Sequence, residues 1–415
     1  MDTEHDRSGT APGRLADPPR LTDGAPADLA GGDGIDAEGL RWEVVDTPQG
    51  LDQAVEALAA AEGPFAVDSE RAGGYRYSQR AYLVQVRRGD SDVFLIDPVP
   101  FAGLDPLAEL LGSDEWILHA ASQDLPCLTE LGLVPPSLFD TELAGRLLGK
   151  ERVGLGPLLA ETLDVHLAKQ HSAADWSSRP LPNAWLEYAA LDVQYLADLR
   201  SHLIQELQDS GKDEWARQEF MHELEVRPRG PRPEPWRRTS RIADARSRRS
   251  LAVVRELWTV RDEIARELDR APGRLVNDRA IMALATRDPL PRSLPVGRTF
   301  RVQRARWEEA YARALALDAS ELPPRRGPRH EGLPDPRNWK NVNPEAAERL
   351  TLVKATIGEL AEEYAVPQEN LLSPAIQRAI AWQSDDVREA LEQTDARPWQ
   401  IDLVAPAVTE ALTAQ

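Results

Sequence analysis

Two acidic side chains, Asp68 and Glu70, stand one residue apart at the end of the apolar run Phe65-Ala66-Val67. The run predicts a buried strand, and alternate side chains of a strand leave the same face. The two residues are then about 7 Å apart along the strand. Such a pair can bind a metal ion, although acidic pairs at strand ends are also common in loops and helix caps.

Three further side chains could act with this pair. Asp124 is expected in the first turn of a helix after the predicted strand 116–120, where a carboxylate could simply interact with the helix dipole. Tyr188 and Asp192 are four residues apart on a predicted helix, so both lie on one face, one turn apart. On an isolated helix, a tyrosine and an aspartate at this spacing usually form a half-exposed pair without a further role.

The four acids together have the pattern that phosphoryl transfer needs. Two divalent cations held by carboxylate oxygens can stabilise the attacking and the leaving oxygen of an in-line displacement. Cations also cancel the repulsion between carboxylates and lower the pKa of bound water, which a nearby tyrosine hydroxyl could orient. His119 and Asp140 are better explained as a structural histidine and as the N-cap of a helix.

The elements that must position these side chains begin with strands. The pattern predicts strands over 42–45, 65–70, 81–86, 93–97 and 116–120, and helices over 51–61, 104–111, 123–131, 140–148, 155–163, 184–207 and 214–224. The early strands pair locally and the later ones alternate with helices. This order predicts an α/β domain with a mixed sheet and helices packed on its faces.

The remainder of the chain reads as all-helical, in two similar modules. Helices are predicted over 251–268, 275–285 and 301–317, and again over 344–364, 371–382, 385–393 and 399–412. Both modules have a long helix, a proline, an apolar doublet and a polar cap before the next helix. This shared order predicts a duplicated helical module with a period of about 95 residues.

Composition sets the boundaries between these parts. Nine arginines stand against two acids between Val226 and Ser250, and the prolines among them predict an extended linker that could also contact phosphates. We expect a disordered acidic segment at 1–40, an α/β domain at 41–226, this Arg/Pro-rich linker at 227–245, a first helical domain at 246–321, a second linker at 322–338 and a second helical domain at 339–415.

The chain has 415 residues, a net charge of −20 and one cysteine, Cys127. A single cysteine excludes an intramolecular disulfide framework and fits a reducing compartment. Neither a signal sequence nor an apolar run of membrane-spanning length is present, so we expect a cytoplasmic protein without a membrane partner. The net charge opposes a polyanionic partner, but the arginine-rich segment is locally positive.

Three segments resemble the exonuclease motifs of DEDD 3′–5′ exonucleases, in the subclass with tyrosine in the third motif. They are Asp68-Ser69-Glu70, His119 to Leu125, and Tyr188 to Asp192. The loop Lys169 to Leu181, with its Lys, Asp-Trp and Arg-Pro-Leu elements, narrows the resemblance to the ribonuclease D family, and Phe139-Asp140-Thr141 and Leu83-Val84-Gln85-Val86 also match. The resemblance covers residues 42–225, and the helical modules resemble, more weakly, helicase-and-RNase-D C-terminal (HRDC) domains.

The resemblance implies a fold and a set of roles. The fold is an RNase H-like mixed-sheet exonuclease domain followed by two small all-α helical-bundle modules, and the cofactors are two divalent metal ions, Mg²⁺ or Mn²⁺. Asp68, Glu70 and Asp192 would hold the cation that activates water, with Asp68 also reaching the second cation and Asp124 serving it. Tyr188 would position the nucleophile.

The same resemblance places Lys169, Trp176 and Arg179 near the substrate. The plain alternative is that Trp176 packs the loop onto the long helix and that Arg179 pairs with a structural acid. The chain also departs from the family at Arg71-Ala72-Gly73-Gly74-Tyr75, which replaces an apolar or Thr-containing stretch. Gly73 and Gly74 could form a flexible lip, with Tyr75 or Tyr77 either stacking a base or packing in the ordinary way.

The activity that the resemblance implies is hydrolysis of RNA from the 3′ end. A metal-dependent 3′–5′ exoribonuclease would release nucleoside 5′-monophosphates from single-stranded 3′ ends, including those of tRNA precursors. The sequence does not give the oligomeric state, and a monomer is favoured. One alternative is a DNA 3′–5′ exonuclease on the same scaffold. The other is a non-catalytic nucleic-acid-binding adaptor, which would have no need of four metal-binding carboxylates and the tyrosine.

Overall fold

The computed structural model describes residues 34–35, 40–167, 174–226, 230, 232–295, 299–327, 332–382 and 386–414. Most of the segment 1–40, which we expected to be disordered, lies outside the described residues, and so does Lys169. Within that segment, Gly34–Ile35 form strand β1, which pairs antiparallel with β2 (Arg41–Val45). The expectation of disorder is therefore wrong for these two residues.

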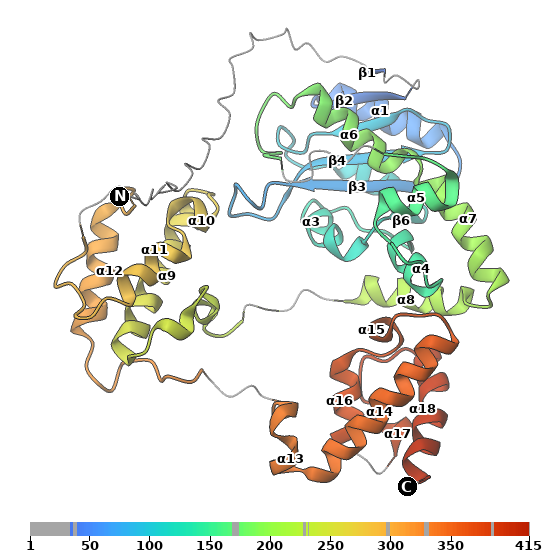
Figure 1. Cartoon of the computed structure of the whole chain (residues 1–415). Coiled ribbons are helices and arrows are strands. Elements are labelled where there is room, and N and C mark those ends of the chain that lie inside the picture. Colours follow the sequence, from blue (N-terminus) through green and yellow to red (C-terminus); the bar gives the residue numbers. More distant parts are fainter. Residues whose placement is uncertain are drawn as a thin grey trace, which may run out of the picture.

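A mixed sheet forms the centre of the first domain (Figure 1). Its other strands are β3 (Phe65–Arg71), β4 (Ala81–Arg88), β5 (Val93–Ile96), β6 (Trp116–Leu118) and β7 (Leu138–Asp140). Among the described residues the strand order is β1-β2-β5-β4-β3-β6-β7. Strand β4 pairs antiparallel with both β3 and β5. The pairs β2 with β5, β3 with β6 and β6 with β7 are parallel. The predicted mixed sheet is confirmed, and the short β7 was missed.

Helices cover the sheet. They are α1 (Pro48–Ala60), α2 (Asp105–Leu111), α3 (Leu125–Glu130), α4 (Thr141–Leu147), α5 (Leu155–Leu163), α6 (Asn183–Gln194), α7 (Leu196–Asp209) and α8 (Asp213–Glu225). Helix α6 packs across β3, β4 and β5. The single helix expected over 184–207 is wrong, because the chain leaves helical geometry at Tyr195, where the Gln194 carbonyl accepts a hydrogen bond from Arg87 at 2.6 Å.

The first helical module has a hydrophobic core of its own. Its helices are α9 (Arg248–Glu267), α10 (Pro272–Leu275), α11 (Asp278–Ala285) and α12 (Arg304–Ala316). The short 3₁₀ turns η2 (Pro235–Arg238) and η3 (Ile242–Asp244) precede them. Trp236 of η2 is only 4% exposed and packs in this core. This part of the Arg/Pro-rich segment is therefore packed on the module and is not extended linker.

The second helical module packs on the first domain through α8. Its elements are η4 (Pro336–Asn338), α13 (Trp339–Val342), α14 (Pro344–Glu363), α15 (Gln368–Leu371), α16 (Pro374–Trp382), α17 (Val387–Glu392) and α18 (Pro398–Thr413). Trp215 of α8 stacks on Trp399 with ring centroids 4.5 Å apart, and Arg397 pairs with the buried Glu219 at 2.7 Å. The buried apolar residues of this module and of the sheet domain consequently form one continuous cluster.

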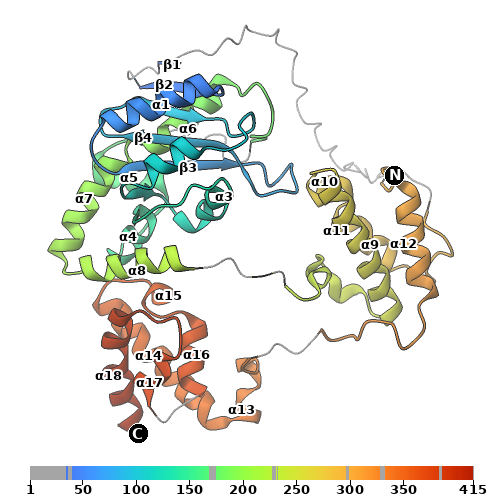
Figure 2. The same cartoon turned by 180° about the vertical axis from the view of Figure 1, so that it is seen from behind.

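The two modules share a local plan. Helices α9 and α14 both have 20 residues, and each is followed by a helix of four residues. Their positions differ, since the second module lies against α8 whereas the first reaches the sheet domain near the loop between β3 and β4 (Figures 1 and 2). None of the helices in the described part of the chain is both long and apolar enough to cross a membrane.

Candidate active site

A cavity of about 660 Å³ opens beside the end of β3. Five of its lining side chains are the ones singled out in the sequence: Asp68 and Glu70 from β3, Asp124 before α3, and Tyr188 and Asp192 from α6. The wall also includes Ser69, Arg71, Gly73, Gly74, Tyr75, Gln79, His119, Ala120, Gln123, Glu142, Gly154, Leu155, Ala174 and Leu196. Segments far apart in the sequence thus meet at one pocket that is rich in carboxylates.

Three of the carboxylates are close enough to share one cation. One oxygen atom each from Asp68, Glu70 and Asp192 can be chosen so that all three lie within 4.8 Å of one another. Strand alternation presents the first two on the same face of β3, and the packing of α6 on β3 brings the third to them. Oxygen ligands at this spacing suit a hard divalent cation such as Mg²⁺ or Mn²⁺.

The acids lie in an environment that opposes their negative charge. Burial, with repulsion from the other carboxylates, raises the pKa of Asp68 well above its usual value and that of Glu70 to about 9. Burial raises the pKa of Asp192 to about 7, with a smaller contribution from Asp124. Such a group of acids is costly to ionise unless a bound cation supplies compensating charge.

Divalent cations should therefore stabilise this protein more at pH 8 than at pH 5.5. A carboxyl of this kind has a pKa of about 4 in the unfolded chain and a higher pKa in the folded protein. Its contribution to the free energy of unfolding is present at low pH and is lost as pH rises from about 4 through the folded pKa, which for Glu70 is about 9. The free energy of unfolding of the metal-free protein should thus fall as pH rises between these two pKa values. A cation at a hundred times its dissociation constant restores about 2.7 kcal/mol, which differential scanning fluorimetry with and without Mg²⁺ or Mn²⁺ would detect.

The matched variant for this experiment is Asp192→Asn, which removes one charge from the group at almost constant volume. It should raise the unfolding midpoint of the metal-free protein at pH 8 and reduce the shift produced by the cation. Equal cation-induced shifts at both pH values, or an undiminished shift in the variant, would contradict cation binding by these acids.

Asp124 is held from the other side of β3. The hydroxyl of Ser69 donates to Asp124 Oδ1 at 2.7 Å, and the same hydroxyl lies 3.2 Å from Sγ of Cys127 on α3. Asp124 is buried, and burial raises its pKa to about 6. Ser69 is a contributor to the site that sequence reasoning missed, although its place between the two acids of the first motif could have indicated it.

The turn that presents Asp124 is fixed by Asp140. Ala120 adopts a left-handed conformation with φ of 62°, which is unfavourable for a residue with a Cβ atom. The Asp140 carboxylate accepts hydrogen bonds from the backbone N–H groups of Ala120, Ala121, Glu142 and Leu143 at 2.8 to 3.1 Å. It caps α4, as expected, and it also ties the strained turn to that helix.

His119 and Tyr188 differ in what they offer to the pocket. The Nδ1 atom of His119 is 2.9 Å from Thr141 Oγ1, and burial lowers the pKa of the imidazole to about 4, so the ring is neutral near pH 7. Tyr188 donates a hydrogen bond to Asp192, and burial raises the pKa of its phenol. The phenol therefore keeps its proton at neutral pH and can act as a hydrogen-bond donor.

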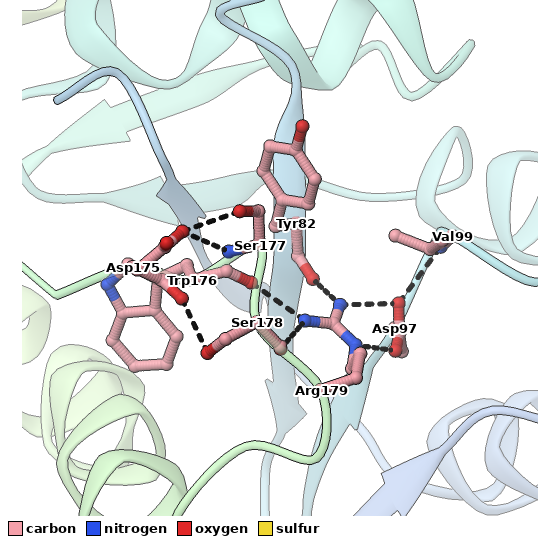
Figure 3. Close-up of polar contacts among 8 residues, drawn as sticks. All are labelled: Tyr82, Asp97, Val99, Asp175, Trp176, Ser177, Ser178 and Arg179. Atoms are coloured by element: carbon pink, nitrogen blue, oxygen red, sulfur yellow. Dashed lines mark hydrogen bonds and ion pairs between the residues drawn. The ribbon is translucent and has the colours of Figure 1, made fainter. Parts of the chain in front are cut away.

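Trp176 and Arg179 are not among the residues that line the pocket. Figure 3 shows that the Trp176 carbonyl and the Arg179 guanidinium take part in structural contacts. Trp176 is fully buried and packs against Trp185 of α6 with ring centroids 5.5 Å apart. Arg179 binds both carboxylate oxygens of Asp97 at 2.5 and 2.8 Å, and it donates to the backbone carbonyls of Tyr82, Trp176 and Ser178. The geometry corresponds to the plain alternative, in which these residues fasten the loop to the sheet domain.

Arg179→Ala should consequently reduce stability rather than substrate affinity. The Arg179 side chain is 32% exposed, whereas Asp97 is largely buried. Leaving the Asp97 carboxylate without this partner should cost about 1–3 kcal/mol, and Arg179→Lys should lose less because it keeps the charge but not the planar fork. Urea denaturation followed by fluorescence would measure the loss. An unchanged denaturation curve together with a KM for RNA raised tenfold or more would instead indicate a substrate contact.

Comparisons with known proteins divide the chain in a similar way. Residues 42–208 match the family model described as 3′-5′ exonuclease. Residues 250–294 match the model of the HRDC domain, and residues 332–412 match one described as 3′ to 5′ exonuclease C-terminal domain. The second helical module is thus matched by a different family model from the first.

Full-length relatives are similar over most of their length. Ribonuclease D of Pseudomonas paraeruginosa is 30% identical over 360 residues, which cover 84% of this chain and 92% of that protein. A crystal structure of a protein from Bifidobacterium adolescentis matches with a TM-score of 0.80 and 36% identity, covering 91% of this chain and 98% of that one. Escherichia coli RNase D, described as an exoribonuclease involved in structured RNA processing, matches with a TM-score of 0.64, 25% identity and coverage of 90% and 99%.

Proposed function

Because this chain belongs to the ribonuclease D family, we propose that it removes nucleotides from the 3′ ends of structured RNAs, tRNA precursors among them. It is a 3′–5′ exoribonuclease with an RNase H-like exonuclease domain, and it uses divalent metal. The observation that carries the proposal is the partly buried group of Asp68, Glu70 and Asp192, with Tyr188 one helical turn from the last of them.

The proposed roles follow from where each side chain lies. Asp68, Glu70 and Asp192 would hold one cation, and Asp68 would also reach a second cation that Asp124 serves. When bound, the cations would supply positive charge at the attacking and leaving oxygens and lower the pKa of the attacking water. Tyr188 would orient that water, since its hydroxyl is protonated and already directed at Asp192. Ser69 would keep the Asp124 carboxylate turned into the site.

The pocket also contains a positive charge of its own. Arg71, the last residue of β3, lines the cavity next to Glu70, and its charge favours ionisation of Glu70 and Asp124. A guanidinium at this place can pair with a substrate phosphate. This local charge helps to explain how a chain with a net charge of −20 accepts a polyanion.

The exoribonuclease interpretation is favoured over both alternatives. Escherichia coli RNase D, which this chain matches over almost its whole length, is described as an exoribonuclease, and a non-catalytic adaptor would have no use for the acid group. We further propose release of nucleoside 5′-monophosphates from single-stranded 3′ ends by a cytoplasmic monomer. The catalytic domain would supply the chemistry, and the helical modules would contact RNA or brace that domain.

The experiment that tests the substrate class compares RNA and DNA oligonucleotides of one sequence, with Mg²⁺ and with Mn²⁺. We expect faster removal of 3′ nucleotides from the RNA, because a ribonuclease can use the 2′-hydroxyl as a donor and acceptor. Chromatography of the products should show nucleoside 5′-monophosphates. A faster rate on the 2′-deoxy oligonucleotide would favour the DNA exonuclease alternative.

A further inference from the structure

The segment 72–78, here named the lip, forms one rim of the active-site pocket. It follows β3 directly, at a point where the pairing of β3 with β4 shifts register between Glu70 and Arg71. Three lip residues, Gly73, Gly74 and Tyr75, line the cavity together with the acids. A displacement of the lip would therefore change the wall of the pocket next to Glu70.

The lip is anchored to the first helical module at its far end. Asp269, between α9 and α10, accepts hydrogen bonds from the backbone N–H of Ser78 at 2.9 Å and from the hydroxyl of Tyr82 on β4 at 3.2 Å. The hydroxyl of Tyr77 donates to Asp262 of α9 at 3.1 Å. These bonds join two domains that have separate hydrophobic cores.

The pocket-lining end of the lip is anchored to the same module. Arg274 of α10 donates from Nε to the Gly74 carbonyl at 2.8 Å, and its guanidinium lies 3.8 Å from the centre of the Tyr75 ring. The backbone N–H of Ala271 donates to the Tyr75 carbonyl at 2.9 Å. Module residues thus contact Gly74 and Tyr75, two of the three lip residues that line the cavity. The loop between β3 and β4 points toward α10 in both views of the molecule (Figures 1 and 2).

These contacts give the unusual lip sequence a structural explanation. The rings of Tyr75 and Tyr77, considered above as base-stacking groups, each lie beside a module arginine, Arg274 and Arg266 respectively. Two consecutive glycines make the intervening backbone permissive. Within its own domain the lip is tied by Arg76, whose Nε donates to Ser177 at 2.7 Å. Because its glycines impose little conformational preference, the lip takes its position largely from its hydrogen bonds to the first helical module.

We propose that the first helical module is a structural part of the active site, in which Asp269 and Arg274 act as positioning residues that fix the lip against the RNA 3′ end. The inference rests on the proposed exoribonuclease function. It differs from a role in which the module only adds an RNA-binding surface. A fixed rim would act on every substrate, because even the shortest RNA must place its terminal nucleotide in the pocket.

The test uses the full-length protein and two RNA substrates, a trinucleotide and a 20-nucleotide single strand. The variants are Arg274→Ala, Asp269→Asn and the double variant. Asn is suited to position 269 because its backbone has φ of 42°, which asparagine tolerates. The control is Arg279→Ala, which removes the same charge from an exposed position on α11 of the same module. The readouts are kcat and KM for each substrate and the unfolding midpoint of each variant.

We expect the double variant to lose about tenfold in kcat/KM on both substrates, since small misplacements of a bound reactant are costly. Arg279→Ala should resemble the unchanged protein, and Arg274→Lys should recover only part of the loss because it lacks the planar guanidinium. A loss confined to the 20-nucleotide RNA, or no loss on either, would overturn the inference. Inactivity of the unchanged protein would overturn the proposed function instead. A lower unfolding midpoint accompanied by unchanged kcat/KM would also count against the inference.

Discussion

Asp68→Asn should reduce hydrolysis of single-stranded RNA by about a thousandfold or more, the scale expected when charge stabilisation of the reacting oxygens is lost. Asp68 is the acid that both proposed cations would touch, and it lies partly buried beside Asp124, Asp192 and Glu70. Asparagine keeps the size of the side chain and removes the negative charge. Initial rates on a labelled oligonucleotide in saturating Mg²⁺ or Mn²⁺ would measure the effect.

The fold should survive this substitution, because removing one of several mutually repelling charges does not destabilise the metal-free site. The matched control is Asp52→Asn, the same chemical change at an exposed position on α1. Its rate should equal that of the unchanged protein. Retention of more than about a tenth of the activity in Asp68→Asn would exclude the proposed role of this carboxylate in a metal-assisted displacement.

Tyr188→Phe should lower kcat by about a hundredfold, within the range for loss of a group that positions or activates the nucleophile. The substitution removes only the hydroxyl that donates to Asp192. KM and the cation concentration at half-maximal rate should change little, because the carboxylates remain. Steady-state kinetics at several cation concentrations would separate these quantities.

Tyr364→Phe provides the control for Tyr188→Phe. Its ring packs against Trp215 at the junction between α8 and the second helical module, and neither residue lines the pocket. Loss of that hydroxyl should leave kcat unchanged. A Tyr188→Phe variant with normal kcat but a much higher cation requirement would show that the hydroxyl serves the metal site rather than the nucleophile.

Local rules placed the acids in separate pairs, and the family resemblance joined them into one predicted site. Strand alternation placed Asp68 and Glu70 on one face, and helical periodicity placed Tyr188 one turn from Asp192. The structure brings these residues together at one pocket, to which the turn before α3 adds Asp124. The strands that carry the site were also predictable, because their apolar runs are continuous and are bounded by turn residues.

Contacts between distant segments were not predictable in the same way. Nothing local in the sequence indicates that the Gln194 carbonyl would bind Arg87 and interrupt the helix after Asp192. The position of Trp236 was not predictable either. Its neighbours in the sequence have the composition of a linker, but its side chain packs in the core of the first helical module. Composition describes a segment's average preference, whereas a single large apolar side chain can decide where that segment packs.

The lip illustrates the same limit for function. Arg71 to Tyr75 departs from the pattern of the family, and the sequence alone suggested a flexible segment whose aromatic residues either stack a base or pack in the ordinary way. The partners of Tyr75 and Tyr77 are almost two hundred residues away in the chain, on α9 and α10. The meaning of such a segment depends on a tertiary contact that no local pattern encodes.

The most direct test of the central claim is a time course on a 20-nucleotide single-stranded RNA labelled at its 5′ end, with the 3′ end either free or blocked by an inverted nucleotide. We predict a ladder of labelled products that shortens one nucleotide at a time from the free 3′ end, no shortening of the blocked RNA, and arrest by a chelator that added Mg²⁺ or Mn²⁺ reverses. Early release of the 5′ label, cleavage of the blocked RNA, or an unchanged rate in the chelator would contradict a metal-dependent 3′–5′ exoribonuclease.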